Sequence, residues 1–186
     1  MAEAAGEGLP QLAMKRGLDG LPPLERPAGV AIRPYTDGDR AAWNAIITES
    51  FGRPHDFTAA MAPDPAYRPE RVLFAVVDGR AVATASAWNR PGPGGKPVGY
   101  LHMVGALPAF QGRGLGRLVS LAALHAMAAE GCAEAALQTD DFRLAAIQTY
   151  LRLGFAPDRG FHPSMPGRWE AVFQSLSNRK GRTVGR

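Results

Sequence analysis

One stretch of the chain, from Gly99 to Gly131, restricts the fold more than any other. It begins as an apolar run with β-branched and aromatic residues, is interrupted by Pro108, crosses the glycine-rich segment QGRGLGR and continues with the repeat of an apolar helix. This pattern predicts a strand, a loop and a helix in that order. Alternate glycines let a ligand approach the loop backbone, and the unpaired N–H groups that begin the helix favour an anion. We therefore predict a phosphate or pyrophosphate site at Gln111–Arg117.

The spacing of the loop glycines excludes two familiar phosphate-binding loops. The glycines are Gly112, Gly114 and Gly116, and Arg117 stands where a G-x-G-x-x-G dinucleotide loop requires its third glycine. A P-loop needs Lys followed by Ser or Thr after its last glycine, and neither pair follows here. The remaining alternative is a glycine-rich turn that only joins a strand to a helix. The order of strand, loop and helix favours the anion site.

Length, hydropathy and cysteine content limit the class of protein. With 186 residues, of which 46% are hydrophobic, the chain suits one globular domain. It has no run of about 18 apolar residues and its start lacks the pattern of a signal peptide, so we expect a cytoplasmic protein without membrane association. The one cysteine, Cys132, excludes an internal disulfide and a cysteine-based metal cluster. Because His55, Asp56 and His162 lack metal-ligand spacing, we expect no metal.

The positive charge of the chain is concentrated at its end. The formal net charge is +4, and the segment 179–186 contains Arg179, Lys180, Arg182 and Arg186, so the rest of the chain is neutral. No basic stripe interleaved with aromatic residues occurs elsewhere, and we therefore expect no specific nucleic-acid partner. We interpret 179–186 as a basic, disordered tail.

Turn residues and periodicity predict the remaining elements. Residues 1–28, rich in Gly, Pro and Ala, are interpreted as a flexible arm, and 29–178 as a single domain. Strands are predicted at 30–35, 72–77, 81–88, 98–107 and 133–139. Two helices are predicted after caps, one after Thr36 or Asp37 and one from Asp140 or Asp141 up to Gly154. Three more are predicted within 50–71, from the glycine loop to Gly131, and after Pro166. Asp78-Gly79 predicts a hairpin, and the helix between the last two strands predicts that they pair in parallel.

Two groups of residues carry a resemblance to the GCN5-related N-acetyltransferases (GNAT). The first is Gln-x-x-Gly-x-Gly at Gln111–Gly116, after a strand and a proline. The second consists of Ala146, Tyr150, Gly154 and Phe155. The resemblance implies a GNAT-like fold of the α/β (α+β) class, with a mixed, mainly antiparallel sheet, a central parallel strand pair and flanking helices. The family usually closes with a strand where our periodicity predicts the last helix.

The same resemblance implies acetyl-CoA as co-substrate and no metal. The strand before the loop is expected to pair its backbone with the pantetheine arm at Val104, Gly105 and Ala106. The residues implied to hold the pyrophosphate are Gln111, Gly112, Arg113, Gly114, Leu115, Gly116 and Arg117, with added charge from the two arginines. Arg143 stands where the family has an Asn, and either reaches a phosphate or points to solvent.

Acetylation of an amine requires a base for the ammonium proton and benefits from an acid for the departing thiolate. Tyr150 matches the family's acid position, and the alternative is a tyrosine that only packs the core. His102 is a candidate base that shares a face with Val104 by strand periodicity, and the alternative is a structural histidine. Many members carry a Glu where this chain has Gln138, and Asp140, the nearest carboxylate, is either a base or a helix cap. A base acting through ordered water also stays open.

We predict an acetyl-CoA-dependent N-acetyltransferase that transfers an acetyl group to a primary amine of a small molecule, by direct attack in a ternary complex. Two alternatives stay open: acetylation of a protein N-terminus or lysine, and a non-catalytic acyl-CoA-binding module. The missing Asn and Glu favour the module, whereas Tyr150 argues against it. The sequence leaves a homodimer open and does not identify the acceptor.

Overall fold

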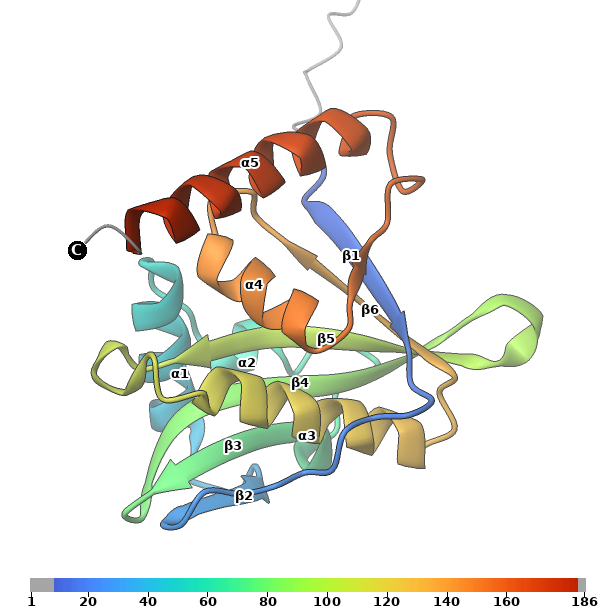
Figure 1. Cartoon of the computed structure of the whole chain (residues 1–186). Coiled ribbons are helices and arrows are strands. Elements are labelled where there is room, and N and C mark those ends of the chain that lie inside the picture. Colours follow the sequence, from blue (N-terminus) through green and yellow to red (C-terminus); the bar gives the residue numbers. More distant parts are fainter. Residues whose placement is uncertain (1–8, 184–186) are drawn as a thin grey trace, which may run out of the picture. The chain divides into compact units, whose positions relative to one another are not determined.

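The computed structural model describes residues 9–183 (Figure 1). Two compact units make up the chain. The larger unit comprises residues 16–137, and the smaller one joins the chain up to Lys15 with the part from Gln138 on.

A mixed sheet forms the core of the larger unit. Its strands are β2 (Val30–Pro34), β3 (Val72–Val77), β4 (Arg80–Pro91), β5 (Pro97–Ala106) and the beginning of β6 (Glu134–Thr139), in the order β2-β3-β4-β5-β6. Neighbouring strands from β2 to β5 are antiparallel. β5 and β6 are parallel, with Gly99 opposite Ala135, as expected for strands joined by a crossover helix. The predicted class, a mainly antiparallel sheet with one parallel strand pair, is confirmed.

The turn between β3 and β4 is decided by its two central residues. Asp78 has a φ of 47° and Gly79 a φ of 77°. A type I′ hairpin turn requires positive φ at both positions, and an Asp-Gly pair adopts it readily. The predicted hairpin is confirmed.

Helices cover both faces of this sheet. They are α1 (Arg40–Phe51), α2 (Phe57–Ala60) and α3 (Leu115–Ala129), with 3₁₀ turns at Pro69–Arg71, Pro93–Gly95 and Pro108–Phe110. A Cβ on Gly105 would meet α1, whereas a Cβ on Gly99 would meet α3. The two glycines lie opposite Thr84 and Asn89, which alternate to different faces of β4. α1 and α3 therefore lie on opposite faces, as Figure 1 also shows.

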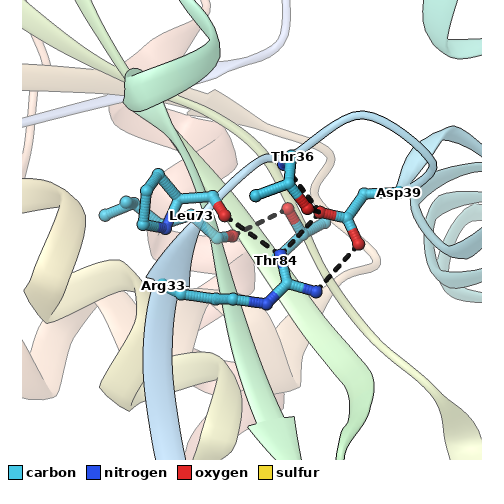
Figure 2. A network of polar contacts seen from close by, with 6 residues as sticks. Arg33, Thr36, Asp39, Leu73 and Thr84 are labelled. Atoms are coloured by element: carbon cyan, nitrogen blue, oxygen red, sulfur yellow. Dashed lines mark hydrogen bonds and ion pairs between the residues drawn. The ribbon is translucent and has the colours of Figure 1, made fainter.

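An ion pair holds the segment between β2 and α1 in place (Figure 2). Asp39 accepts hydrogen bonds from Arg33 Nη1 (2.5 Å) and Nη2 (2.8 Å), and from the N–H (2.7 Å) and Oγ1 (2.9 Å) of Thr36. These hydrogen bonds, led by those of Arg33, lower the pKa of Asp39 to about 2. The predicted cap at Thr36 or Asp37 is wrong, because Asp39 is the N-cap residue and turns its side chain back to Thr36.

The smaller unit includes the beginning of a strand that the sequence did not predict. β1 (Leu12–Gly17) pairs antiparallel with β7 (Ala156–Pro157), with Met14 opposite Pro157. Leu12 and Met14 are fully buried. The prediction of a flexible arm over 1–28 is therefore wrong for these residues, because the apolar surface that they bury offsets the conformational entropy lost on ordering. Residues 1–8 lie outside the described part of the chain.

Two helices complete this unit, α4 (Leu144–Arg152) and α5 (Met165–Thr183). The predicted helix after Pro166 is confirmed, with Trp169 and Val172 buried. α5 continues to Thr183, so the prediction of a disordered tail is wrong for 179–183. Residues 184–186 lie outside the described part of the chain.

The start of α4 lacks the predicted carboxylate cap. Arg143 is the N-cap residue, and its side chain makes no capping hydrogen bond. Asp140 instead accepts a hydrogen bond from Gln11 Nε2 (2.8 Å), and Asp141 pairs with the Arg168 guanidinium. The hydrogen bonds from Arg168 lower the pKa of Asp141. Both carboxylates thus have partners elsewhere in the smaller unit, which is why the predicted cap is wrong.

Candidate functional site

The loop between β5 and α3 has the geometry of an anion site. Gly112 and Gly114 both have a φ of 76°, and Gly114 is the N-cap residue of α3. The first helical bond runs from the N–H of Leu118 to the carbonyl of Gly114, at 2.9 Å. The N–H groups of Leu115, Gly116 and Arg117 therefore have no partner within the helix, and the N-cap residue Gly114 has no side chain with which to cap them. Gly114 and Arg117 are exposed at this helix start, and its electropositive end favours an anion.

The three loop glycines have different roles. Gly112 and Gly114 occupy the left-handed region, which L side chains adopt only under strain. Gly116 lies inside α3 without a positive φ, and a Cβ there would meet no atom within 4 Å. Conformation thus requires glycine at the first two positions but not at the third.

Two basic side chains gather beside the loop. The guanidinium carbon of Arg113 lies 5.3 Å from the centre of the Phe110 ring, and that of Arg80 lies 5.9 Å from the same ring. Arg117 is exposed on the first turn of α3. Gln111 reaches back to the strand, where its Nε2 lies 3.5 Å from the carbonyl oxygen of Ala106. The structure thus brings the predicted loop residues together with the end of β5.

A β-bulge interrupts β5 just before the loop. The register against β4 shifts between Thr84 and Ser86, so that Met103 and Val104 together face a single residue of β4. Met103 has a φ of 46°, which is uncommon for a residue other than glycine. An extra residue in a strained conformation bends a strand and interrupts its pairing. β5 is therefore distorted at the residues predicted to meet the pantetheine arm.

The bulge also decides which residues share a face. His102 lies opposite Ser86, and Gly105 lies opposite Thr84. Thr84 and Ser86 are two residues apart on β4 and so point to the same side. His102 therefore shares the α1-facing side with Gly105. The prediction that it shares a face with Val104 is wrong, because the extra residue reverses the alternation.

Past the bulge, neighbouring residues direct their backbone groups differently. The N–H of Leu107 donates to the carbonyl of Val82, at 2.9 Å. Because paired residues alternate along antiparallel strands, Gly105 turns its N–H and C=O toward β4 and Ala106 turns its own away. Ala106 is bound instead by Ser50 of α1, whose Oγ accepts from the N–H (2.9 Å) and donates to the C=O (3.1 Å). Sequence reasoning missed Ser50 because the contact joins residues 56 positions apart.

Aromatic rings surround His102. The centre of its ring lies 3.9 Å from that of Trp88 and 5.9 Å from that of Tyr100. The guanidinium of Arg90 lies over both aromatic rings, at 5.2 and 5.5 Å, and pairs with Asp64 at 2.9 Å. We call Trp88, Tyr100 and His102 the ring cluster.

The surroundings of His102 keep it neutral. Burial, aided by the positive charge of Arg90 and opposed by Asp64, lowers the pKa of His102 to about 4. The ring is therefore unprotonated at pH 7 and can accept a proton, although it holds that proton weakly. Next to it, the buried Ser86 Oγ and Trp88 Nε1 have no hydrogen-bond partner among the described residues.

The smaller unit holds the remaining predicted site residues. Tyr150 lies on α4 with 7% of its surface exposed, and its ring meets Phe155 edge to face, with centres 6.1 Å apart. Asp140 is bound by Gln11, and Arg143 begins α4. The roles assigned to Tyr150, Asp140 and Arg143 remain predictions.

Comparison with known proteins decides the family. The sequence profile of the Acetyltransferase (GNAT) family matches residues 40–155, which hold β3 to β6, the glycine loop and α4. The chain belongs to the GNAT acetyltransferase family. This confirms the resemblance that the loop motif and the Tyr150 region carried.

Relatives and solved GNAT structures agree with this membership. Mycothiol acetyltransferase of Kytococcus sedentarius is 32% identical over 73% of this chain and 48% of its own length. The protein of that name in Thermomonospora curvata is 32% identical over 83% of this chain and 55% of its own length. A GCN5-related N-acetyltransferase from Sphaerobacter thermophilus superimposes with a TM-score of 0.60 at 28% identity, over 81% of this chain and 50% of that one. The chain spans about half the length of these proteins.

The described residues 9–183 hold neither a membrane-spanning helix nor a group of metal-binding side chains. None of their helices combines the length and the apolar character needed to cross a bilayer. Nor do three His, Cys, Asp or Glu side chains in this part of the chain gather into a group that could hold a metal ion.

Proposed function

We propose that the protein is an acetyl-CoA-dependent N-acetyltransferase that acetylates a primary amine of a small molecule by direct attack in a ternary complex. The observation that carries the proposal is the uncapped start of α3 behind the left-handed Gly112 and Gly114, directly after the bulged end of β5. Such a helix start favours the pyrophosphate of CoA. Two relatives bear the name of an acetyltransferase for a small molecule, mycothiol, which supports this class of acceptor.

The chemistry assigns a task to each proposed residue. An alkyl ammonium has a pKa near 10, so only about one molecule in a thousand is a neutral nucleophile at pH 7. His102 is unprotonated at that pH and is our first choice for the proton acceptor, while Asp140 and ordered water are the alternatives. The oxyanion that forms on the thioester gains from a backbone N–H of the bulged strand. Tyr150 is proposed to protonate the departing thiolate.

The cofactor contacts divide between strand and loop. The backbone at Val104–Ala106 is proposed to meet the pantetheine arm, and Gly112–Arg117 the pyrophosphate. Gln111 and Arg113 flank the loop and Arg143 is proposed to add charge. The directions of the backbone groups favour Ala106 over Gly105 as the residue that pairs with the pantetheine arm. The N–H and C=O of Ala106 turn away from β4, whereas those of Gly105 do not.

One assay tests the proposal most directly. Cleavage of the acetyl-CoA thioester is followed against a panel of small amines, peptides with free N-termini and lysine peptides. We expect turnover with small primary amines. Turnover with peptides alone would indicate a protein acetyltransferase, and binding of CoA without any turnover would indicate a non-catalytic acyl-CoA-binding module.

Tyr150→Phe tests the proposed acid, because it keeps the ring and removes only the hydroxyl. General acid catalysis typically contributes about 100- to 10,000-fold, so we expect kcat to fall at least 100-fold. CoA affinity and melting temperature should stay near those of the wild type. Full kcat in the variant would exclude the acid role, and a joint loss of stability and activity would assign the tyrosine to the core.

A further inference from the structure

Ser50 occupies a place on β5 that a neighbouring strand would otherwise take. Its Oγ accepts a hydrogen bond from the N–H of Ala106 at 2.9 Å and donates one to the C=O of the same residue at 3.1 Å. A strand partner satisfies the N–H and C=O of one residue in this paired way. One hydroxyl from the last turn of α1 thus satisfies both groups of Ala106.

The approach of Ser50 depends on a missing side chain. A Cβ on Gly105 would lie 2.6 Å from Ser50 Oγ and 3.1 Å from Ile47 Cδ1. The first distance is too short for any real contact, so a larger residue at 105 would push the hydroxyl from Ala106. Glycine at this position therefore has a packing reason, because Gly105 itself needs no positive φ.

The two groups that Ser50 holds are the ones an extended ligand needs. They turn away from β4, at the end of β5 that leads through Gln111 into the anion loop. The pantetheine arm of CoA carries two amide groups and extends from the pyrophosphate. An arm that runs from the loop along β5 would therefore form its backbone hydrogen bonds at Ala106, where Ser50 now lies.

We propose that Ser50 is a displaceable hydrogen-bond partner, which holds the N–H and C=O of Ala106 in the free protein and releases them to the pantetheine arm. The inference rests on the proposed function, since it assumes that CoA binds along β5. Ser50 prevents the strand end from being unsatisfied or paired wrongly when no ligand is present. Because CoA must first break the hydrogen bonds of Ser50, its binding is weaker than it would be without them. A ligand without the arm breaks no such bond, and its affinity does not depend on Ser50.

The test compares two ligands and three proteins by calorimetric titration. CoA carries the arm, and 3′-phosphoadenosine 5′-diphosphate carries only the nucleotide and pyrophosphate. Ser50→Ala should bind CoA about two- to tenfold more tightly than the wild type, the equivalent of one hydrogen bond that no longer has to be broken. Its affinity for the nucleotide should be unchanged.

Thr48→Val is the matched control on α1. Thr48 Oγ1 accepts a hydrogen bond from the N–H of His55 (3.1 Å), and among the described residues it forms no hydrogen bond with β5. This variant removes a hydroxyl hydrogen bond from the same helix, and we expect both ligands to bind it as they bind the wild type. An equal gain in CoA affinity in both variants would overturn the inference, because it would reflect loosening of α1.

Amide hydrogen exchange at Ala106 gives a second readout that needs no ligand. The N–H should exchange more slowly in the free wild type than in free Ser50→Ala, and CoA should protect it in both proteins. Equal exchange in the two free proteins, or weaker CoA binding by Ser50→Ala, would overturn the inference. If neither ligand binds the wild type, the proposed function itself fails.

Discussion

The anion loop follows the end of β5, whereas the ring cluster lies within β4 and β5, and the two regions obtain their properties in different ways. The loop Gln111–Arg117 is largely exposed, and the φ angles of its own glycines set its shape. The ring cluster is assembled from β4 and β5, and its chemistry depends on burial and on the neighbouring Arg90 and Asp64. Substitutions within the loop should therefore change its shape and its affinity for an anion. The pKa of His102 in the ring cluster should depend in addition on the residues that surround it.

The largest effect is expected at the ring cluster. If His102 accepts the ammonium proton, His102→Gln should lower kcat/KM at pH 7 by about 100- to 10,000-fold. The acid limb of the wild-type profile should lie near pH 4, because burial lowers the pKa of His102 to about 4 rather than leaving it near that of free imidazole. The pH profile of kcat/KM measures this. A variant with the wild-type rate and profile would leave Asp140 or ordered water as the base.

The same residue should make stability depend on pH. Its pKa is about 4 in the folded protein against 6.5 for the unperturbed group, so the unfolded chain binds the additional proton between these values. Stability is thus full above pH 6.5 and should fall by about 3 kcal/mol as the pH drops toward 4. Denaturant unfolding of wild type and His102→Gln across this range gives the difference. Parallel curves would show that the ring is not buried as described.

At the loop, a charge placed on the backbone site should remove CoA binding. Gly114→Glu places a side chain at a left-handed residue, which costs about 1–2 kcal/mol of folding stability. It also places a negative charge beside the bound pyrophosphate, and the repulsion between two such charges is about 1–4 kcal/mol at 4 Å near a protein surface. We expect CoA affinity to fall by about 100-fold in calorimetric titration. Unchanged affinity would place the cofactor elsewhere.

The smallest effect is expected two residues later. Gly116 is helical, and a Cβ there would meet no atom within 4 Å, so Gly116→Ala should raise stability by about 0.5–1 kcal/mol. CoA affinity should remain within about twofold, because the N–H group is kept. Thermal unfolding and CoA titration of this variant and of Gly114→Glu show whether CoA affinity depends on the left-handed conformation of the loop or on the number of its glycines. A large loss of affinity would mean that the ligand contacts Gly116 more closely than the free structure allows.

The sequence by itself determined the features that depend on neighbours along the chain. Asp78-Gly79 specified a hairpin because two adjacent residues adopt positive φ. The order of strand, glycine loop and helix specified the geometry of the loop and indicated the family, since the glycines and the helix start lie within a few residues of each other. Periodicity found α5 in the same way, from the spacing of Trp169 and Val172.

Only the tertiary structure decided the features that join distant segments. β1 is ordered because Met14 pairs with the strand that contains Pro157, and no pattern within residues 1–28 indicates that partner. The bulge at Met103 appears only in the register of β5 against β4, and it moves His102 away from the face of Val104. Ser50 reaches Ala106 because α1 packs over Gly105. Local dihedral preferences act over a few residues, whereas register, burial and the pKa of His102 arise from surfaces that meet only when the chain is folded.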